Sequence, residues 1–320
     1  MKVSIYLLCY NEKIYLPITV SYYKSQFPNA KITILDNYSE DNSVEIAKML
    51  GCNVSNWHYS DDGRCENKDG TIPPKSIRNR FWTDEEDNTW IITHDMDEFL
   101  CINDIQLEYE DKVGTTIILT NGYNMIGNSQ KLDLSDVNLY EISTGYRNTL
   151  FDKRVCFKKG PIKKMNFIGT GQHVCKPDGN IVYSKEIYYH HHLKYISDKY
   201  LVNRYLNVYK PAEKNSPNKH YQYKNEEEVL RHLSSYKKID NPGNLLQLKP
   251  LSYYMRDKID YKNIKLPSII YTGGKKLTKK KLTKSKLNKL KVTEIKLLLK
   301  KKNLPTYGNK DILITRYLKK

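Results

Sequence analysis

Three acidic residues stand within four positions, directly after a short apolar segment. The segment 90–93 has the β-branched and aromatic content of a buried strand, and Asp95, Asp97 and Glu98 follow it. Carboxylates crowded at a strand end repel one another and raise each other's pKa, unless a cation or a positive substrate group compensates them. The spacing therefore predicts a site for something positive. The alternative is an ordinary strand that runs into a solvated acidic turn.

Divalent-metal binding is the chemistry that suits this spacing. In an extended chain the apolar Met96 points the opposite way, so the carboxylates of Asp95 and Asp97 lie on one side. We expect Asp97 to ligate the cation. Asp95 is expected to hold a ribose or to reach the cation through water, with Glu98 in a supporting place. Carboxylate oxygens with one imidazole favour Mn²⁺ or Mg²⁺ over zinc, and Mn²⁺ is the first choice.

Histidines that could supply this imidazole occur late in the chain. His190, His191 and His192 lie in a β-branched and aromatic stretch that predicts a strand, where neighbouring side chains alternate between faces. At most two of them share a site, and His191, pointing oppositely, is expected to tolerate substitution. His173 follows two glycines that allow close approach of backbone and substrate, so it either meets a substrate or is a plain turn histidine.

The elements that must position these residues alternate between strands and helices. This alternation predicts an α/β fold with a parallel sheet, whose ligands bind beyond the carboxyl ends of the strands. Asp36 and the Asp95/Asp97 pair would both lie at such ends and could face one pocket. The strands are expected at 2–10, 31–37, 53–57, 90–93 and 115–127, and the helices at 12–27, from an N-cap at Ser39 to a stop at Gly51, and at 75–83.

The first strand ends suggest a nucleotide site. Asp36 could accept a hydrogen bond from a uracil or guanine N–H, and Asn11 and Glu12 would line the same site. Arg78, in the helical stretch before the acidic strand end, could reach a diphosphate or ribose. The alternative is that Asp36 and its neighbours are turn and capping residues, and that Arg78 is an exposed helix residue.

Four segments, in order, resemble a nucleotide-sugar-dependent glycosyltransferase of the GT-A type, close to family 2. "YNEKIYLP" resembles the family's first strand and helix, and "ILDNYSEDNSVEIA" resembles its nucleotide-binding turn. "HDMDEFL" resembles its D-x-D metal motif. "TGQHVCKPDG" and "YYHHHLKYIS" resemble the late segment of one family branch, in which a histidine completes the metal site. Together they span about residues 3 to 205.

The resemblance implies a GT-A (Rossmann-like) mixed sheet flanked by helices and a nucleotide-diphosphate sugar as donor. It aligns one metal-binding histidine five residues before a serine, and counting back from Ser197 gives His192. The implied metal site is thus Asp95, Asp97 and His192. A carboxylate-held cation would neutralise the leaving diphosphate. The acceptor is an unknown hydroxyl group, and the absence of the family's Q-x-x-R-W motif speaks against processive synthesis.

An inverting transferase also needs a base that deprotonates the acceptor hydroxyl. The sequence leaves this base open among His173, Asp152, Asp178 and Glu186.

Length and composition bound the class of protein. The chain has 320 residues and 39% hydrophobic residues, enough for one large domain with an appendage. No apolar run approaches the roughly 20 residues that span a bilayer, and the first segment is too short for a signal peptide. The six cysteines form no C-x-x-C pair. We expect a protein of the cytoplasm or a nucleus-like compartment that is not secreted.

The net charge of +17 is concentrated in the tail. From Gly274 to Lys320 there are 17 lysines and arginines and two acids, which leaves +2 for residues 1–273. "GGKKLTKKKLTKSK" predicts a flexible linker over 273–286. The segment 287–320 resembles a SAP motif, a helix-loop-helix module that binds DNA; the alternative is a lysine-rich hairpin for solubility or protein contact.

The expected organisation is a GT-A-like domain at 1–210, a helical and loop extension packed on it at 211–272, the linker, and the SAP-like module. Two other functions remain open. Carboxylates with a basic module could serve a metal-dependent nucleotidyltransferase or nuclease on DNA, although residues 1–273 lack a basic excess. An inactive DNA-tethered scaffold is the third reading.

Overall fold

A computed structural model describes residues 1–57, 74–127, 134, 137–168, 171–209, 225–237, 245–256, 310, 314 and 315. The chain divides into two compact units, 1–270 and 271–320. The expected linker and most of the SAP-like module lie outside the described residues. Within the described ranges, no helix is long and apolar enough to cross a membrane.

The first half of the chain forms parallel strands. These are β1 (Lys2–Cys9), β2 (Lys31–Asp36), β3 (Asn53–Asn56) and β4 (Thr89–Asp95), in the order β4-β1-β2-β3. The α/β alternation expected from the sequence is confirmed here. All four carboxyl ends meet at one edge of the sheet, which brings Asp36 and Asp95 to the same edge.

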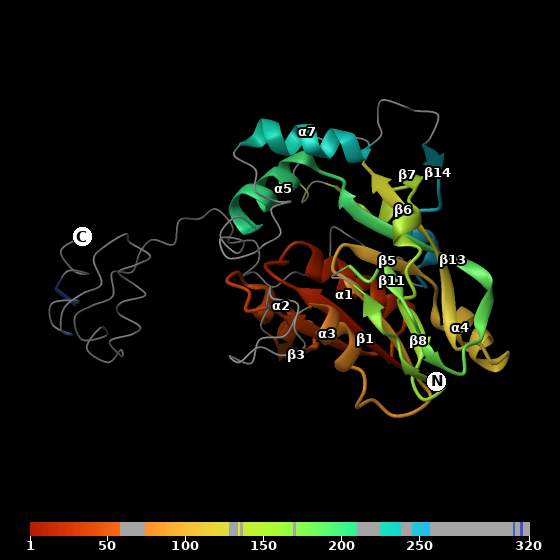
Figure 1. Cartoon of the computed structure of the whole chain (residues 1–320). Helices are drawn as coiled ribbons and strands as arrows, with labels where there is room; N and C mark the ends of the chain where they lie inside the picture. The colour runs from red at the N-terminus through yellow and green to blue at the C-terminus, as the bar shows by residue number, and fades with distance from the viewer. Residues whose placement is uncertain are drawn as a thin grey trace. The chain divides into compact units, whose positions relative to one another are not determined.

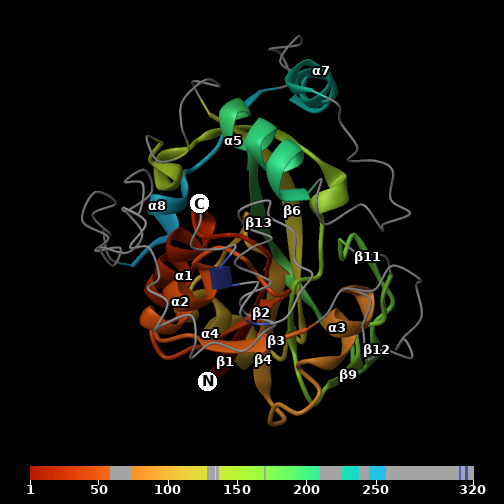
Figure 2. The ribbon, with the colours of Figure 1, turned by 90° about the vertical axis from the view of Figure 1, so that its left-hand side faces the viewer.

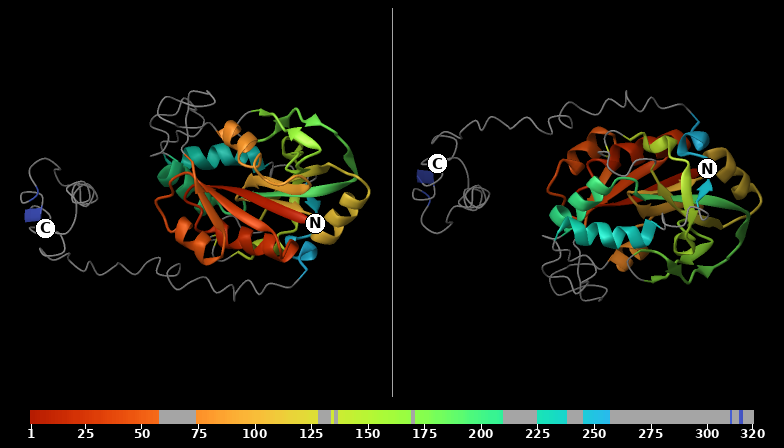
Figure 3. Two further views of the ribbon diagram at one scale, coloured as in Figure 1. Left: turned by 90° about the horizontal axis from the view of Figure 1, so that it is seen from below. Right: turned by 90° about the horizontal axis from the view of Figure 1, so that it is seen from above.

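Three helices cover this part of the sheet: α1 (Tyr15–Gln26), α2 (Ser43–Met49) and α3 (Pro74–Arg80). Pro17 is tolerated because it lies in the first turn, where a backbone N–H has no partner within the helix. Figure 2 shows α1 and α2 on one side of the sheet and α3 on the other, and both panels of Figure 3 agree. The expected N-cap at Ser39 is wrong, because α2 begins after Asn42.

Each sheet face has its own hydrophobic core, because alternate side chains of β1, β2 and β4 point to opposite faces. The face toward α1 contributes Ile5, Leu7, Ile34 and Ile92 to the larger core. The face toward α3 contributes Tyr6, Leu35 and Ile91 to the second core, which includes Trp82 and Phe157. Burial of both faces explains why these strands read as continuous apolar runs.

The second half of the chain makes the sheet mixed. β13 (Tyr183–Tyr195) lies between β5 (Glu98–Cys101) and β6 (Ile117–Ile126), antiparallel to the first and parallel to the second. β8 (Cys156–Lys158) runs antiparallel to β4 and links it to β6. Helix α4 (Asp104–Lys112) begins with a capping box at Asn103 and holds Tyr188 of β13 through a hydrogen bond to Glu110.

Within the described residues, ten strands join in this sheet, and the remaining elements surround it (Figure 1). Residues beyond 211 add strand β14 (Leu246–Gln247) to the edge of the sheet, beside β7 (Thr144–Arg147). The elements outside this sheet that have not yet been given are η2 (Leu139–Glu141), η3 (Thr149–Phe151), β9 (Ile162–Lys164), β10 (Phe167–Ile168), β11 (Val174–Cys175), β12 (Asp178–Gly179), α5 (Asp198–Asn203), η4 (Arg204–Tyr209), α7 (Glu226–Lys237) and α8 (Leu251–Tyr254).

Candidate functional site

The acidic run lies at a chain reversal. β4 ends at Asp95, residues 96 and 97 form a turn, and β5 begins at Glu98. The prediction of an extended chain through these acidic residues is therefore wrong. Met96 is buried in the larger core, and His94 donates from Nδ1 to the Asp95 carbonyl at 2.8 Å. The turn, not strand alternation, decides where each carboxylate points.

One acidic cluster of the described residues has ligand atoms close enough to share a cation. Asp97, Glu98 and His192 each offer one such atom, all within 4.8 Å of one another. The sheet register brings them together, because His192 pairs with Glu98 across β13 and β5. His192 Nε2 lies 3.7 Å from Asp97 Oδ2. This set differs from the expected one: Glu98 is included and Asp95 is not.

The imidazole of His192 is held in the state that a metal ligand requires. Its Nδ1 lies 2.7 Å from Asn124 Oδ1, and the Asn124 amide donates to the Tyr146 hydroxyl at 2.8 Å. Since Asn124 Oδ1 can only accept, Nδ1 carries the proton and Nε2 keeps its lone pair toward Asp97. Burial keeps the pKa of His192 well below 6.5, so the ring is neutral at neutral pH.

Beside this cluster, two buried acceptor atoms face each other without a hydrogen-bond partner. His190 donates from Nδ1 to the Phe151 carbonyl at 3.1 Å, which leaves a lone pair on Nε2. That atom lies 3.7 Å from Glu98 Oε2, and neither has a partner. The other Glu98 oxygen accepts from Lys153, which is 1% exposed. Unpaired buried acceptors are costly, so this arrangement favours a bound positive group.

The electrostatics of Asp97 point the same way. Burial raises its pKa to about 7; Arg204 opposes the shift, and the carboxylates of Glu12, Glu98 and Asp95 add to it. A divalent cation would offset this repulsion and restore the charged form. Two carboxylates with one neutral imidazole suit Mn²⁺ or Mg²⁺, so the residues present fit the expected metal.

Asp95 is engaged by Arg78 instead. The Arg78 guanidinium is 2% exposed and bonds both Asp95 and Gln172. Although burial raises the pKa of Asp95, Arg78 and then Lys153 hold it well below its usual 3.8. The alternative that Arg78 is an exposed helix residue is therefore wrong, because it is buried. It lines the cavity and connects α3 with the end of β4 and with the turn before β11.

Two of the expected nucleotide-binding residues are occupied by hydrogen bonds within the protein. Asp36 accepts from the backbone and hydroxyl of Ser39 at 3.0 and 2.6 Å. Asn11 has a positive φ of 55°, and its Oδ1 accepts from the amides of Glu40 and Asp41 at 2.7 and 3.2 Å. Both thus shape the loop after β2, and neither lines the cavity. Their role in binding a nucleotide remains a prediction.

Glu12 does line the cavity, paired with Arg204 of η4. Burial raises the pKa of Glu12, against the opposing charge of Arg204, and its Oε2 is buried without a partner. Arg204 also donates to the Tyr200 hydroxyl at 2.6 Å.

These groups surround one open cavity of about 710 Å³, large enough for a nucleotide sugar. At one end lie Tyr10, Asn37 and Trp57, which follow the first three parallel strands. At the other lie Asn148, Leu150 and Phe151 near η3, with Lys194 and Tyr205. Asp95, Asp97, Glu98 and His192 line it between these groups, together with the cationic side chains of Arg78, Lys153 and Arg204.

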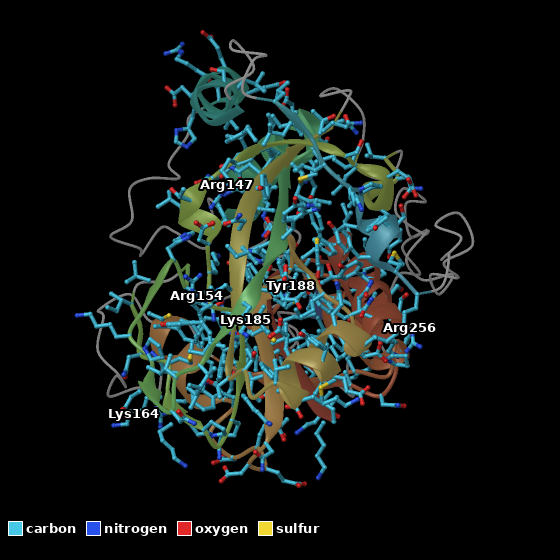
Figure 4. The ribbon with its side chains drawn as sticks, turned by 90° about the vertical axis from the view of Figure 1, so that its right-hand side faces the viewer. Arg147, Arg154, Lys164, Lys185, Tyr188 and Arg256 are labelled. Atoms are coloured by element: carbon cyan, nitrogen blue, oxygen red, sulfur yellow. The ribbon has the colours of Figure 1, made fainter. Side chains whose placement is uncertain are left out.

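Of the four candidate bases, His173 lines this cavity and the other three do not. Asp152 pairs with Arg147, labelled in Figure 4, at 2.6 Å and accepts from the Gly122 amide at 2.8 Å. Asp178 lies exposed on β12, which pairs with β9. Glu186 is exposed on β13, next to Lys185 (Figure 4). None of the three is placed to meet a substrate in the cavity.

His191 points away from its neighbours, as expected, but into an aromatic cluster. Its ring lies 6.3 to 6.4 Å from the rings of Tyr123, Tyr189 and Tyr254. It is fully buried, and neither ring nitrogen has a partner. The expected tolerance to substitution does not suit this environment, because truncation would leave a cavity in the core.

His192→Gln should weaken Mn²⁺ binding by at least about tenfold, because it removes the Nε2 lone pair that faces Asp97. His190→Gln is the comparison variant and should weaken Mn²⁺ binding less. It changes a buried ring on the same strand and face, whose Nε2 faces Glu98 Oε2 but lies outside the three-residue cluster. Calorimetric titration with Mn²⁺ measures both affinities without any donor. Equal losses in the two variants would contradict the assignment of His192.

Four contributors were missed by sequence reasoning: Asn124, Lys153, Gln172 and Arg204. Each acts through a partner far away in the chain, and no spacing signal marked them. Only Gln172 had a hint, because it lies between the glycine-rich turn and His173.

No protein-family model matches this chain, and no curated protein matches it. Solved structures that resemble it include TarS from S. aureus, with 13% identity and a TM-score of 0.39 over 75% of this chain and 74% of that chain. TarS in complex with UDP-GlcNAc shows 13% identity and a TM-score of 0.36, over 75% of both chains.

The mannosyltransferase PcManGT from Pyrobaculum calidifontis, in complex with GDP-Man and Mn²⁺, shows 11% identity and a TM-score of 0.32 over 99% of this chain and 84% of that chain. Scores this low do not decide what this chain binds. The structure of this chain itself shows a mixed α/β sheet flanked by helices, which is the general fold class expected from the sequence.

Proposed function

We propose that the protein is a metal-dependent glycosyltransferase that moves a sugar from a nucleotide-diphosphate donor to a hydroxyl acceptor. The observation that carries the proposal is the cluster of Asp97, Glu98 and His192 in a cavity at the carboxyl ends of the parallel strands. In open α/β sheets this edge is where nucleotides bind. The cluster has the donor atoms for Mn²⁺ or Mg²⁺, and the cavity has room for a nucleotide sugar.

The charges of the cavity suit a diphosphate. A bound divalent cation would neutralise the diphosphate as it leaves. Arg78, Lys153 and Arg204 add positive charge around the same space, each balanced by a carboxylate in the free protein. A diphosphate can accept charge-assisted hydrogen bonds from these cationic side chains.

The nucleobase of the donor would lie at the end of the cavity that follows strands β1 to β3. Trp57 and Tyr10 offer aromatic faces there, and Asn37 offers an amide that can pair with a base edge. The Trp57 indole is fixed by donating to the Leu35 carbonyl at 3.1 Å. This end follows the first three strands, and it is lined by Tyr10, Asn37 and Trp57 and not by the predicted Asn11 and Asp36.

Hydrolysis of nucleotide sugars tests the proposal without knowledge of the acceptor. The purified full chain is incubated with a panel of UDP-sugars and GDP-sugars, with Mn²⁺, with Mg²⁺ and with EDTA, and release of the nucleoside diphosphate is measured. We expect release from one class of donor, supported by Mn²⁺ and abolished by EDTA. Absence of binding and of release across the panel, with metal present, would exclude this function.

Residues 287–320 are proposed to hold the enzyme on duplex DNA. The support is the net charge of +15 between Gly274 and Lys320, together with the resemblance to a SAP motif. Binding of this kind is made largely through phosphates and weakens with salt, so a salt titration of DNA binding by the full chain tests it.

A further inference from the structure

His173 lines the cavity, and a hydrogen bond from one of its ring nitrogens determines which nitrogen carries the proton. Its Nδ1 lies 2.6 Å from the Leu150 carbonyl oxygen, which can only accept a hydrogen bond. Nδ1 therefore carries the proton, and Nε2 keeps a lone pair. The side chain is partly open to solvent, so a second substrate can reach it.

The backbone around His173 is shaped to hold the ring in this place. A Cβ at Gly171 would lie 2.4 Å from His173 Nε2, so only glycine leaves room for the imidazole. On the other side, a Cβ at Gly122 would lie 2.2 Å from Phe151 Cβ, so glycine there lets η3 pack onto β6. The Phe151 ring meets the His173 ring edge-on at 5.3 Å.

Phe151 also sets the spacing between His173 and the metal cluster. The Phe151 ring also stacks on the His192 ring, with 4.1 Å between the ring centres and an angle of 22° between the planes. His173 thus lies one aromatic ring beyond the proposed metal ligand. An in-line displacement needs a base that is separated from the leaving group, and Phe151 keeps His173 from direct contact with His192.

The carboxylates that line the cavity are committed elsewhere. Asp95 is paired with Arg78, and Glu12 with Arg204. Asp97 and Glu98 belong to the proposed metal cluster. A base must accept a proton within hydrogen-bond reach of the acceptor, and among the four candidates from the sequence His173 is the one in the cavity.

We propose that His173 is the general base that activates the acceptor hydroxyl, an assignment that rests on the glycosyltransferase function proposed above. Nε2 takes the hydroxyl proton while the acceptor oxygen forms its bond to the anomeric carbon. The bond from that carbon to the diphosphate oxygen breaks, and the electron pair leaves with the nucleoside diphosphate. The products are a glycoside of inverted configuration, the nucleoside diphosphate and a protonated His173, which releases its proton to solvent.

The charged groups near His173 are Lys153, Glu98 and Asp95. Burial, and next the Lys153 ammonium, lower the pKa of His173 below 6.5, while the hydrogen bond to Leu150 and the two carboxylates oppose the shift. The imidazole is therefore neutral, and able to accept a proton, at neutral pH. Activity should fall as the pH decreases through this pKa and the ring becomes charged.

The test uses water as the acceptor and whichever donor the full chain hydrolyses in the panel. His173→Gln keeps a donor group near the Leu150 carbonyl but removes the base. We expect kcat for hydrolysis to fall by about 100-fold or more, with the Mn²⁺-dependent donor Kd within about twofold of wild type. The acidic limb of the pH profile should disappear. Gly171→Ala should lower kcat as well, because the new Cβ displaces the ring. Val174→Ala, at the exposed next position, is the control that should leave kcat unchanged.

A second measurement does not depend on turnover. In protein labelled with ¹⁵N-histidine, the ring nitrogens of His173 should show a proton on Nδ1 and none on Nε2 at neutral pH. A proton on Nε2 would overturn the assignment. So would a His173→Gln variant that keeps wild-type kcat and its acidic limb, although the proposed function would then stand. If the wild type itself neither binds nor hydrolyses any donor, the proposed function fails and the base assignment fails with it.

Discussion

Asp97→Ala should abolish metal-dependent turnover. The change removes the carboxylate whose Oδ2 faces His192 Nε2, and with it one of the two charged oxygen ligands of the cluster. Electrostatic stabilisation by a bound cation contributes several kcal/mol to such a step, so we expect a loss of about a thousandfold or more in donor hydrolysis. Initial rates across a Mn²⁺ titration provide the measurement.

Two comparisons separate this loss from a general effect of removing an acid. Asp95→Asn should leave metal binding largely intact, because Asp95 lies outside the cluster and is paired with Arg78. It should mainly weaken donor binding, because Asp95 is the residue predicted to hold the ribose. Asp87→Asn changes an exposed acid that pairs with Lys159 on the surface, and it should leave both activity and Mn²⁺ affinity unchanged. Full Mn²⁺-dependent activity in Asp97→Ala would end the metal assignment.

The pKa of Asp97 gives this prediction a pH dependence. Its pKa in the folded protein, about 7, lies above the ordinary value of 3.8, so the metal-free folded state binds the proton more tightly than the unfolded state does. The stability of the metal-free protein should therefore fall as the pH rises between these values. Metal needs the ionised form, so the increase in melting temperature caused by Mn²⁺ should grow as the pH rises through about 7, and Asp97→Ala should lose this growth.

Lys153→Met should destabilise the fold by about 3 to 5 kcal/mol. The Lys153 ammonium and the Glu98 carboxylate are both almost completely buried, so removing the cation leaves a buried charge without compensation. Urea denaturation in the absence of metal measures the free energy of unfolding. Activity is a poor readout here, because Lys153 also lines the cavity.

Lys153→Met combined with Glu98→Gln is the decisive partner variant. With the carboxylate made neutral, the double variant should recover at least about half of the lost free energy of unfolding. Lys159→Met removes a lysine whose partner, Asp87, is exposed, and it should cost less than about 1 kcal/mol. A single Lys153→Met variant as stable as wild type would show that the buried pair contributes little.

The sequence predicted the elements better than the partners within the site. Apolar runs and alternation are local properties, so the strands around Ile5, Ile34 and Ile92 could be placed from their own residues. The acids at the end of β4 were recognised because like charges in sequence are close in any fold. The chain reversal at Met96 was not recognised. A single buried strand and two buried strands joined by a tight turn have the same apolar pattern in the sequence.

The identity of each carboxylate's partner depended on tertiary contacts. No residue near Asp95 in the sequence indicates that it pairs with Arg78, and none near Glu98 indicates that it pairs with Lys153. Asp36 is the opposite case. Its partner Ser39 is three residues away, and the capping tendency of an Asp before a Ser was a local signal that competed with the nucleotide assignment.

The place of β13 between β5 and β6 determines when the site can exist during folding. Strands β1 to β4 leave the ribosome well before residues 183–195, so the acids after β4 are made before their histidine partner. Insertion of β13 requires a long-range parallel pairing with β6, which is a slow kind of step. A slip of one residue would turn His191 toward the acids and bury His192 among the tyrosines. A cation that binds only the correct register would therefore favour the one strand pairing in which Asp97, Glu98 and His192 come together.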